Sequence, residues 1–395
     1  MSAATGHRAA LLAGYLGWTL DAFDFFLVVF CLTSIGRQFH MSDAEMALTL
    51  TATLAFRPLG AFLFGLIADR YGRRLPLMLD LVFYSVIEVA SGLAPNFTVF
   101  LALRCLFGVG MGGEWGVGAS LTMEKVPVRL RGVLSGFLQQ GYATGYLLAA
   151  VCYFFLFPRV GWRPLFFVGG LPALLALFVR MRVKESEVWE RTRHASWSHL
   201  GRALLGNWKL FLYMAVLMMA MNLVAHGSQD MYPTFLERQW GFGVGTRSLI
   251  TGISMTGAIA GGTLFGLMSD RVGRRRAMIA ALAGALLAIP LWAFAPSVPL
   301  LIAGAFLMQF LVQGSWGVVP AHLAELSPDA VRGFLPGFGY QTGVLLASGV
   351  SYLEAVLARH TSYSWAMAGT AAIVIAMAIV ATALGKERRG VVFGG

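Results

Sequence analysis

The sequence predicts an all-α membrane protein with twelve transmembrane helices. Of its 395 residues, 57% are hydrophobic and 12% are charged, whereas a soluble protein has about 25% charged residues. One helix needs roughly 20 apolar residues to cross a bilayer. Apolar runs of helical length occur at 10–35, 45–68, 75–94, 97–122, 132–157, 162–181, 208–236, 247–269, 277–295, 298–324, 334–358 and 363–385. We therefore expect twelve spans with a lipid bilayer around them, and no water-soluble enzyme.

An internal repeat divides the chain into two halves. Residues 65–74, GLIADRYGRR, return as residues 266–275, GLMSDRVGRR, at an offset of 201. The same offset relates Trp115 to Trp316, Glu124 to Glu325, Arg131 to Arg332, and Gln140 to Gln341. A constant offset of this kind indicates a duplicated unit. We expect a six-helix bundle at 1–181, a charged cytoplasmic linker at 182–207 and a second six-helix bundle at 208–395.

The distribution of basic residues accounts for the net charge of +11 without nucleic acid. Lys and Arg gather in alternate loops in a ratio of roughly 22 to 6, and such residues collect in cytoplasmic loops. Both termini are therefore predicted to be cytoplasmic, in a plasma membrane of the bacterial inner-membrane type. The three cysteines fall within apolar runs, which predicts no disulfide and no metal site. The glycine-rich stretch 108–118 follows no strand, so it indicates helix packing and no nucleotide cofactor.

The repeated segment carries a resemblance to a known family. Its pattern, Gly-x-x-x-Asp-Arg-x-Gly-Arg-Arg, resembles the signature loop of the major facilitator superfamily. Residues 104–112, RCLFGVGMG, are similar to the second motif of that superfamily. The resemblance implies two six-helix bundles around a central site that opens alternately to each side of the membrane.

A second resemblance concerns the seventh span. Residues 222–234, NLVAHGSQDMYPT, resemble the signature of the Jen-type lactate and pyruvate permeases, except that Ala225 stands where a hydroxyl is expected. These permeases belong to the sialate:proton symporter family, whose sialic-acid members resemble this chain around Asp21, Asp24 and Arg57. Some of those members carry additional helices between the halves, and this chain has none there. The departure favours a small carboxylate over a nine-carbon sugar acid.

Ionisable side chains within the spans are the first functional candidates, because each costs at least about 2.5–3.5 kcal/mol to insert. Those near the middle of a span are Asp21, Asp24, Arg57, Glu114 and Asp230, and Arg104 lies about one-third of the way into its span. Asp21 and Asp24 share a helical face, and two neighbouring carboxylates in low dielectric cannot both stay ionised cheaply. One of them is a candidate carrier of a transported proton. Alternatively, one is permanently paired with Arg57 or Arg104 and holds the N-terminal bundle together.

Two buried arginines have different expected roles. Arg57 is placed at mid-span, and its planar guanidinium can hold a substrate carboxylate with two parallel hydrogen bonds. The family resemblance agrees, because relatives carry an arginine at the equivalent place; the alternative is a structural pair with Asp21 or Asp24. Arg104 resembles the superfamily's second-motif arginine, which implies proton coupling, but a structural ion pair with the first helix remains equally open. Glu114 is a further candidate for proton coupling.

Polar residues of the seventh span form another candidate group. His226 and Asp230 are four residues apart, so they can hydrogen-bond on one face and relay protons near neutral pH. Asn222 lies one turn earlier and could orient substrate oxygens. The density of polar groups outweighs the simpler reading of His226 as a satisfied core residue, because lipid offers these groups no partners. Expected to line the cavity are Tyr232 and the repeat-equivalent Gln140 and Gln341, although the two glutamines could instead bridge helices.

The repeated loops are expected to act as gates. An aspartate at a helix end can face the N-terminal dipole of a helix in the other half, a contact worth about 0.3–1 kcal/mol when exposed. Such a contact would hold one side of the transporter shut. The predicted gate residues are Asp69, Arg70, Arg73, Glu124, Asp270, Arg274 and Glu325. The alternative for some of the arginines is anchoring at the cytoplasmic membrane surface.

These features predict a monomeric, proton-coupled importer of small monocarboxylates such as lactate or pyruvate, working by alternating access. Within the same class, sialic acid or another sugar acid is the alternative substrate. A proton-driven efflux antiporter is less expected, since the signature of the seventh span is that of uptake proteins. A non-transporting sensor with a transporter fold is a further alternative, less expected because only 11 residues follow Leu384.

Overall fold

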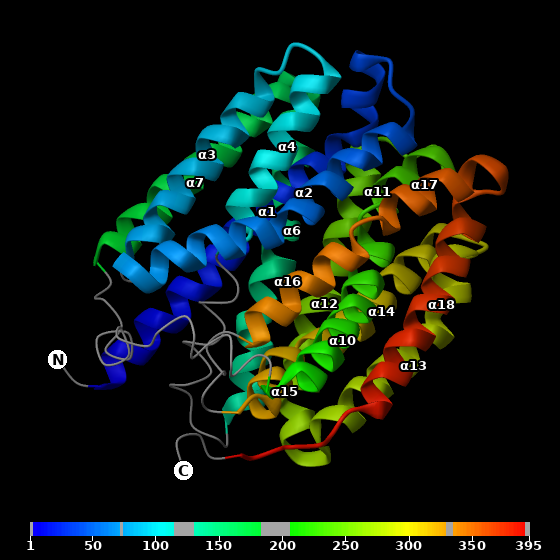
Figure 1. Ribbon diagram of the computed structural model, residues 1–395. Coiled ribbons are helices and arrows are strands. Elements are labelled where there is room, and N and C mark those ends of the chain that lie inside the picture. Colours follow the sequence, from blue (N-terminus) through cyan, green and yellow to red (C-terminus); the bar gives the residue numbers. More distant parts are fainter. Residues whose placement is uncertain (1–2, 72–73, 114–129, 183–205, 329–334, 392–395) are drawn as a thin grey trace.

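The computed structural model describes residues 3–71, 74–113, 130–182, 206–328 and 335–391. These residues form helices and no strands (Figure 1). The N-terminal set consists of α1 (Ala3–Phe39), α2 (Asp43–Tyr71), α3 (Arg74–Gly92), α4 (Phe97–Met111), α6 (Arg131–Val160) and α7 (Arg163–Arg182). The C-terminal set consists of α10 (Trp208–Gln229), α11 (Tyr232–Arg238), α12 (Val244–Val272), α13 (Arg274–Ala293), α14 (Val298–Trp316), α15 (Val319–Leu326), α16 (Leu335–Ala347), α17 (Val350–His360) and α18 (Tyr363–Leu384).

Within the described ranges, nine helical stretches are long and apolar enough to cross a membrane. Helices α3, α4 and α7 complete a set of twelve spans, because α10 with α11, α14 with α15, and α16 with α17 each form one span. The expected all-α architecture of twelve spans is confirmed. The 201-residue repeat also appears in the helix bounds, since α12 begins and ends 201 residues after α2.

Three spans expected to be continuous are broken in the structure. Helix α10 ends at Gln229 and α11 begins at Tyr232, and similar breaks separate α14 from α15 and α16 from α17. Pro233 and Pro320 occupy the first turns of α11 and α15, where a missing N–H is tolerated although it would interrupt a continuous helix. The first of these breaks falls beside Asp230, so the backbone changes direction at a predicted site residue.

The glycines of α4 let it lie directly against α2. A Cβ at Gly108 would lie 2.1 Å from the carbonyl oxygen of Thr53, and one at Gly112 would lie 1.9 Å from that of Arg57. Both distances are too short for any side chain, so the two backbones are in contact. This agrees with the predicted role of residues 108–113 in helix packing. The contact also fixes the height of Arg57 against the neighbouring helix.

The two sets of helices meet along one plane, which contains the candidate site. Helix α6 packs along α12, and α2 packs along α16 and α17. We call the end at which α1 begins and α18 finishes the proximal end, and the opposite end, where α1 finishes and α2 begins, the distal end (Figure 1).

Candidate transport site

The distal end is closed by ionic contacts between the two sets. Glu237 of α11 accepts a hydrogen bond from Thr33 Oγ1 at 2.6 Å and pairs with Arg37, both of α1. Arg238 donates two hydrogen bonds, of 2.9 and 2.7 Å, to the Asp43 carboxylate at the start of α2. The helix ends on this side are therefore tied together in pairs across the plane.

A second network closes the proximal end. Arg274 of α13 donates to Asp270 at 2.7 Å and to both oxygens of Glu325, at 2.9 and 3.0 Å. The network crosses to the N-terminal set, where Arg131 Nη1 lies 3.3 Å from Glu325 Oε1. The backbone N–H of Gly132, in the first turn of α6, donates to Asp270 Oδ1 at 3.1 Å. Three of the predicted gate residues are thus brought together at the N-terminus of a helix from the other set.

The segment after α18 is fastened to this proximal network. The Glu387 carboxylate accepts hydrogen bonds from the backbone N–H groups of Arg274 and Arg275, the first two residues of α13. Arg131 Nη1 also donates to the carbonyl oxygen of Val391 at 2.9 Å, and the N–H of Gly390 donates to Glu325 at 3.3 Å. Residues 386–391 therefore bridge both sets, a contact that the sequence did not predict.

Other predicted gate residues cannot be placed. Glu124 and Arg73 lie outside the described residues, as does Glu114. Asp69 and Arg70 belong to the last turn of α2, but their side chains are likewise outside the description.

Between the two ends, Arg57 lies fully buried on the plane between the sets. Its guanidinium carbon is 5.8 Å from the centre of the Trp18 ring of α1 and 5.7 Å from that of Tyr340 of α16, so both sets contact it. Such distances are typical of cation–π contacts. Its Nε and Nη2 atoms have no hydrogen-bond partner among the described residues. Two donors on one edge of the guanidinium are therefore available in the centre of the molecule.

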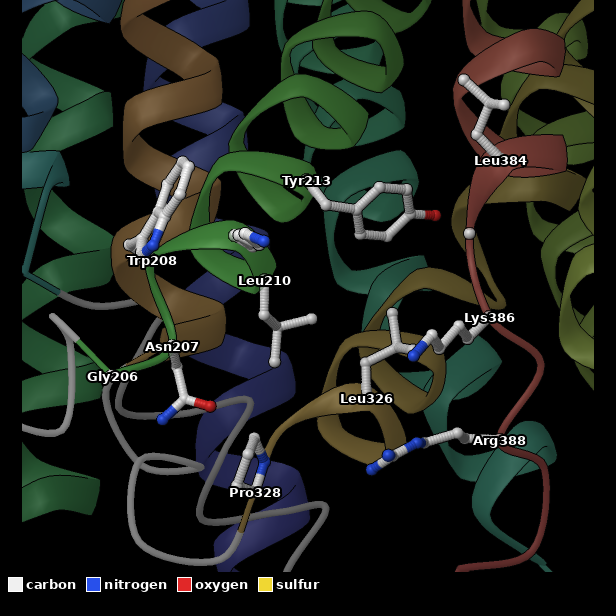
Figure 2. Close-up of a pocket in the computed structure, with 12 residues that line it drawn as sticks. Gly206, Asn207, Trp208, Leu210, Tyr213, Leu326, Pro328, Leu384, Lys386 and Arg388 are labelled. Atoms are coloured by element: carbon white, nitrogen blue, oxygen red, sulfur yellow. The ribbon is translucent and has the colours of Figure 1, made fainter.

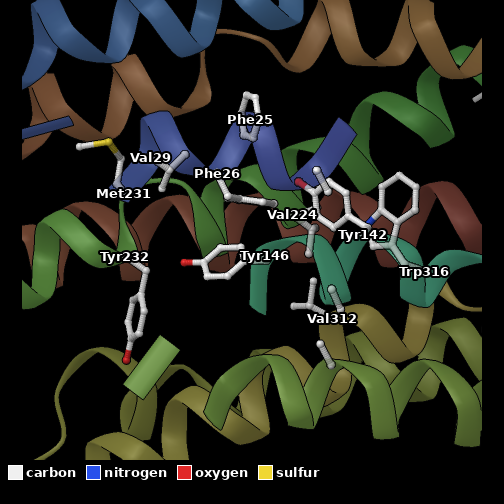
Figure 3. Packing of buried hydrophobic residues seen from close by; sticks show 14 of the residues in the cluster. Phe25, Phe26, Val29, Tyr142, Tyr146, Val224, Met231, Tyr232, Val312 and Trp316 are labelled. Carbon is white, nitrogen blue, oxygen red and sulfur yellow. The ribbon is translucent and has the colours of Figure 1, made fainter. Parts of the chain in front are cut away.

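Aromatic side chains from four helices surround this guanidinium. Trp18 packs against Tyr142 of α6, with ring centres 5.5 Å apart, and Tyr340 lies 6.1 Å from Trp316 of α14. Tyr142 also packs against Phe26 of α1, with ring centres 5.2 Å apart (Figure 3). The hydroxyl of Tyr142 has no partner among the described residues. The centre thus offers flat apolar faces with a few polar atoms, as small-molecule sites commonly do.

The predicted histidine pair forms in the C-terminal set. His226 Nδ1 lies 3.0 Å from Asp230 Oδ2, and Ser351 Oγ of α17 donates to the same oxygen at 2.9 Å. His226 also contacts Phe25 of α1 edge to face, with ring centres 5.7 Å apart. The pair is therefore buried at the plane between the sets. Asn222 donates to the Met218 carbonyl of its own helix.

Arg104 has a different partner from the one suggested by the sequence. It lies 2.8 Å from the Glu88 carboxylate of α3 rather than paired with the first helix, and it also hydrogen-bonds Ser91. The Phe107 ring lies 4.6 Å from its guanidinium carbon. Asp24 faces this same cluster, because a Cβ at Gly169 would lie 2.8 Å from Asp24 Oδ1 and 3.3 Å from Glu88 Cγ. The cluster occupies the interior of the N-terminal set, away from the plane.

The remaining predicted binding residues mostly serve packing contacts. Gln341 Nε2 donates to the Gly112 carbonyl at 3.0 Å, so it bridges the two sets. Gln140 donates to its own helix at Gly136 and lies against Gly262 of α12. Tyr232 stacks on Trp292 of α13, with ring centres 5.5 Å apart, inside the C-terminal set. Asp21 is buried in α1.

Several buried polar residues with notable positions were not singled out by the sequence. Glu88, Glu237 and Glu354 are buried or nearly buried carboxylates, and Ser351 completes the contacts of Asp230. Glu88 and Glu354 lie within predicted apolar spans, which by itself makes them candidates. A complete survey of acidic residues within the spans would have found both.

The two sets carry their buried charges at different repeat positions. The counterparts of Arg57, Glu88 and Arg104 at the offset of 201 are Ala258, Ile289 and Ala305. In the opposite direction, the counterparts of His226, Asp230 and Glu354 are Phe25, Val29 and Tyr153. The two sets therefore share a repeated helix arrangement but carry their buried ionisable side chains at different positions.

A cavity of about 710 Å³ lies at the proximal end, away from the central guanidinium. Figure 2 shows it between the start of α10, the end of α15 and the end of α18. Its basic lining residues are Lys209, Lys386 and Arg388.

Comparisons with known proteins agree with this architecture. Residues 14–229 match the family model of the Major Facilitator Superfamily, and residues 228–385 match the model described as Sugar (and other) transporter. The fold is similar to that of the proton:xylose symporter XylE, with a TM-score of 0.80 at 19% identity, covering 98% of each chain.

Relatives at higher identity have names of transport proteins. The chain is 30% identical over 372 residues to a carboxylic acid transporter protein homolog of Saccharomyces cerevisiae, covering 87% of this chain and 60% of that one. It is 31% identical over 394 residues to a probable 4-methylmuconolactone transporter of Cupriavidus pinatubonensis, covering 96% and 90%. It is 29% identical over 340 residues to the sialic acid transporter NanX of Escherichia coli, covering 85% and 84%. The chain is therefore a membrane transporter rather than an enzyme, and it belongs to the major facilitator superfamily.

Proposed function

We propose that this protein imports small organic monocarboxylates together with protons, by alternating access. The observation that carries the proposal is the buried Arg57 guanidinium, which contacts both sets of helices and has two N–H donors available. A substrate carboxylate could accept both donors in parallel, and such charge-assisted pairs are roughly twice as strong as neutral hydrogen bonds. A group touched by both sets is well placed to sense their relative movement.

Closure at both ends supports the alternating-access part of the proposal. The ionic contacts of Glu237 at the distal end and of Glu325 at the proximal end share no residue, so one end can open while the other stays shut. With both termini in the cytoplasm, as the basic loops predict, the proximal end faces the cytoplasm. Substrate would enter at the distal end and leave at the proximal end.

The proton has two candidate carriers in this proposal. In the N-terminal set, Asp24 lies beside Glu88, which pairs with Arg104. Two carboxylates beside one cation favour a proton on one of them. In the C-terminal set, His226 and Asp230 form a hydrogen-bonded pair beside the plane. Both groups are buried, so movement of the sets is required before water reaches them.

The substrate is proposed to be lactate or pyruvate, in line with the signature of the seventh span. A similarity to a carboxylic acid transporter homolog supports the carboxylate, and a similarity to a sialic acid transporter keeps sialic acid as the alternative. The flat rings of Trp18, Tyr142, Tyr340 and Trp316 suit a planar carboxylate such as pyruvate.

Uptake into proteoliposomes tests the function. We expect saturable uptake of labelled L-lactate or pyruvate that needs an inward proton gradient and is lost in Arg57→Ala. Arg57→Lys keeps the charge but not the planar pair of donors, so it should retain transport with a raised KM. The matched control is Arg159→Ala, because Arg159 is exposed and bonds its own helix.

Other outcomes separate the alternatives. Uptake of sialic acid alone would move the substrate to the sugar-acid class. Movement of the acids out of the vesicles, driven by an inward proton gradient, would indicate an efflux antiporter. Gradient-independent transport would refute coupling, and an absence of transport for all three acids would favour a sensor.

A further inference from the structure

Glu354 of α17 is a fully buried carboxyl group that the proposed transport site does not use. Its side chain is 0% exposed, and neither carboxyl oxygen has a hydrogen-bond partner among the described residues. A Cβ at Gly227 of α10 would lie 3.3 Å from Glu354 Oε1, 3.3 Å from Val350 Cγ2 and 3.8 Å from Thr370 Cγ2. The carboxyl therefore occupies a notch in α10 that glycine leaves open, among methyl groups.

A second carboxylate lies beside this notch. Asp230 follows Gly227 by three residues and is hydrogen-bonded to Ser351, which stands three residues before Glu354 on α17. Asp230 already accepts hydrogen bonds from Ser351 and contacts His226. An isolated carboxylate in an apolar surrounding is strongly disfavoured, and a second carboxylate close by adds to the cost. The surroundings of Glu354 therefore suit a neutral carboxylic acid.

The other helices that pack against α17 supply no balancing charge at this height. Helix α18 has one titratable side chain, Tyr363, at its first residue. Helix α2 carries Asp43 and Glu45 in its first turn, Arg57 at mid-length, where it faces Trp18 and Tyr340, and further titratable residues in its last turn. On α17 itself, Arg359 and His360 stand in the last turn. Tyr352 of α17 is exposed. Among the described residues of these helices, His226 and Asp230 are therefore the titratable neighbours of the notch.

We propose that Glu354 is a proton carrier of the C-terminal set, holding one proton beside the hydrogen-bonded pair of Asp230 and His226. The proposal rests on the proposed proton-coupled function and deepens it. Ser351 and Glu354 are three residues apart on α17, so they share a face, and Ser351 connects that face to Asp230. The proton leaves Glu354 as the carboxylate forms and water receives it, once movement of the sets hydrates the notch. No other bond is made or broken.

A spectroscopic experiment tests this assignment without any substrate. Infrared difference spectra of the protein in lipid vesicles, taken between mildly acidic and alkaline pH, report the carbonyl stretch of protonated carboxyl groups. We expect a band in the wild type that is missing from Glu354→Gln and retained in Glu45→Gln, whose side chain is exposed. Identical spectra for the wild type and Glu354→Gln would overturn the assignment.

A transport experiment then tests the carrier role. Glu354→Gln imitates the protonated state, so it should still exchange substrate across the membrane without a gradient, but it should lose accumulation driven by protons. Accumulation equal to the wild type would refute the carrier role. If the wild type moves no lactate or pyruvate, the proposed function fails, whereas the infrared result still decides the protonation of Glu354.

A second variant keeps the test decisive if Glu354→Gln does not fold. Glu354→Asp retains the acid but draws it back from Gly227, so the infrared band should shift in position. An unchanged band in this variant would assign the protonated carboxyl to another residue.

Discussion

Arg57 and Arg104, two of the fully buried arginines of the N-terminal set, have opposite surroundings. Arg104 lies inside the set, against the Glu88 carboxylate and the Phe107 ring, whereas Arg57 lies on the plane and touches residues of both sets. A buried ion pair is weak support for stability, but removal of one partner leaves a charge without compensation. The surroundings of Arg104 thus suit a structural ion pair, and those of Arg57 suit a ligand.

Replacement of Glu88 by alanine should therefore destabilise the protein. The Arg104 guanidinium would remain buried with its ionic partner removed, at a cost of about 3–5 kcal/mol. Thermal unfolding in detergent measures the effect, with Glu45→Ala as an exposed carboxylate control. The double variant Glu88→Ala, Arg104→Leu removes both charges and should recover part of the loss. Equal melting temperatures for Glu88→Ala and Glu45→Ala would contradict this account.

Individual residues differ in how far the sequence could foretell their contacts. The pair of His226 and Asp230 follows from a spacing of four residues in one helix, and its geometry was expected from that alone. The pair of Arg104 and Glu88 joins two different helices, so the spacing of residues along the sequence does not predict it. Glu354 has no ionic partner among the described residues, so its position within an apolar span is the signal that the sequence offers for it.

Pairs of helices in this molecule are held together by backbone contact as much as by side chains. Gly60 and Gly108 place α2 against α4, because a Cβ at Gly60 would lie 1.7 Å from the carbonyl oxygen of Val109. Lipid offers no hydrophobic drive for helix association, so close packing of small residues supplies it. The number of spans could be predicted from apolar length. Gly227 and Pro233 predict a weak point in the seventh span, near the break at residues 230–231. The breaks at 317–318 and 348–349 could not be predicted, since glycine and proline also occur in unbroken helices.

A single added methyl group should be enough to disturb this helix pair. Gly60→Ala forces α2 and α4 apart, and overpacking of a tight core commonly costs about 1–3 kcal/mol. The matched control is Gly369→Ala in α18, where a Cβ meets nothing within 4 Å; there the better helix propensity of alanine predicts no loss of stability. Comparison of the two melting temperatures decides the point. Similar values would mean that the α2–α4 contact yields easily.

At the scale of the whole molecule, the ionic networks of the two ends hold the sets together on both sides of Arg57. The repeat predicted two equivalent halves and gates in the repeated loops. It could not predict that Glu237 closes the distal end or that residues 386–391 join the proximal network, because neither has a counterpart in a repeated motif. These contacts arise only when the two sets are brought face to face.

The two ends should open independently when their networks are weakened. Glu325→Gln removes charge from the hydrogen bonds with Arg131 and Arg274, and hydrogen bonds to charged groups are worth about 1.5–3 kcal/mol. Amide exchange of residues 131–135 should accelerate by about ten-fold or more, with no change in residues 231–238. Glu237→Gln should produce the reverse pattern, so each variant serves as the control for the other. Acceleration at both ends in either variant would show that the networks open together.

The different buried ionisable residues of the two repeats have a consequence for the ancestry of the chain. A protein assembled from two copies of the N-terminal set would face its partner with two Arg57 guanidiniums and would contain neither His226 nor Glu354. Two copies of the C-terminal set would contain no Arg57. Neither symmetric ancestor would contain all the residues used in the proposed chemistry. The difference between the halves therefore arose after duplication. Chimeras that exchange halves between relatives should inherit carboxylate binding from one parent and the Glu354 proton site from the other.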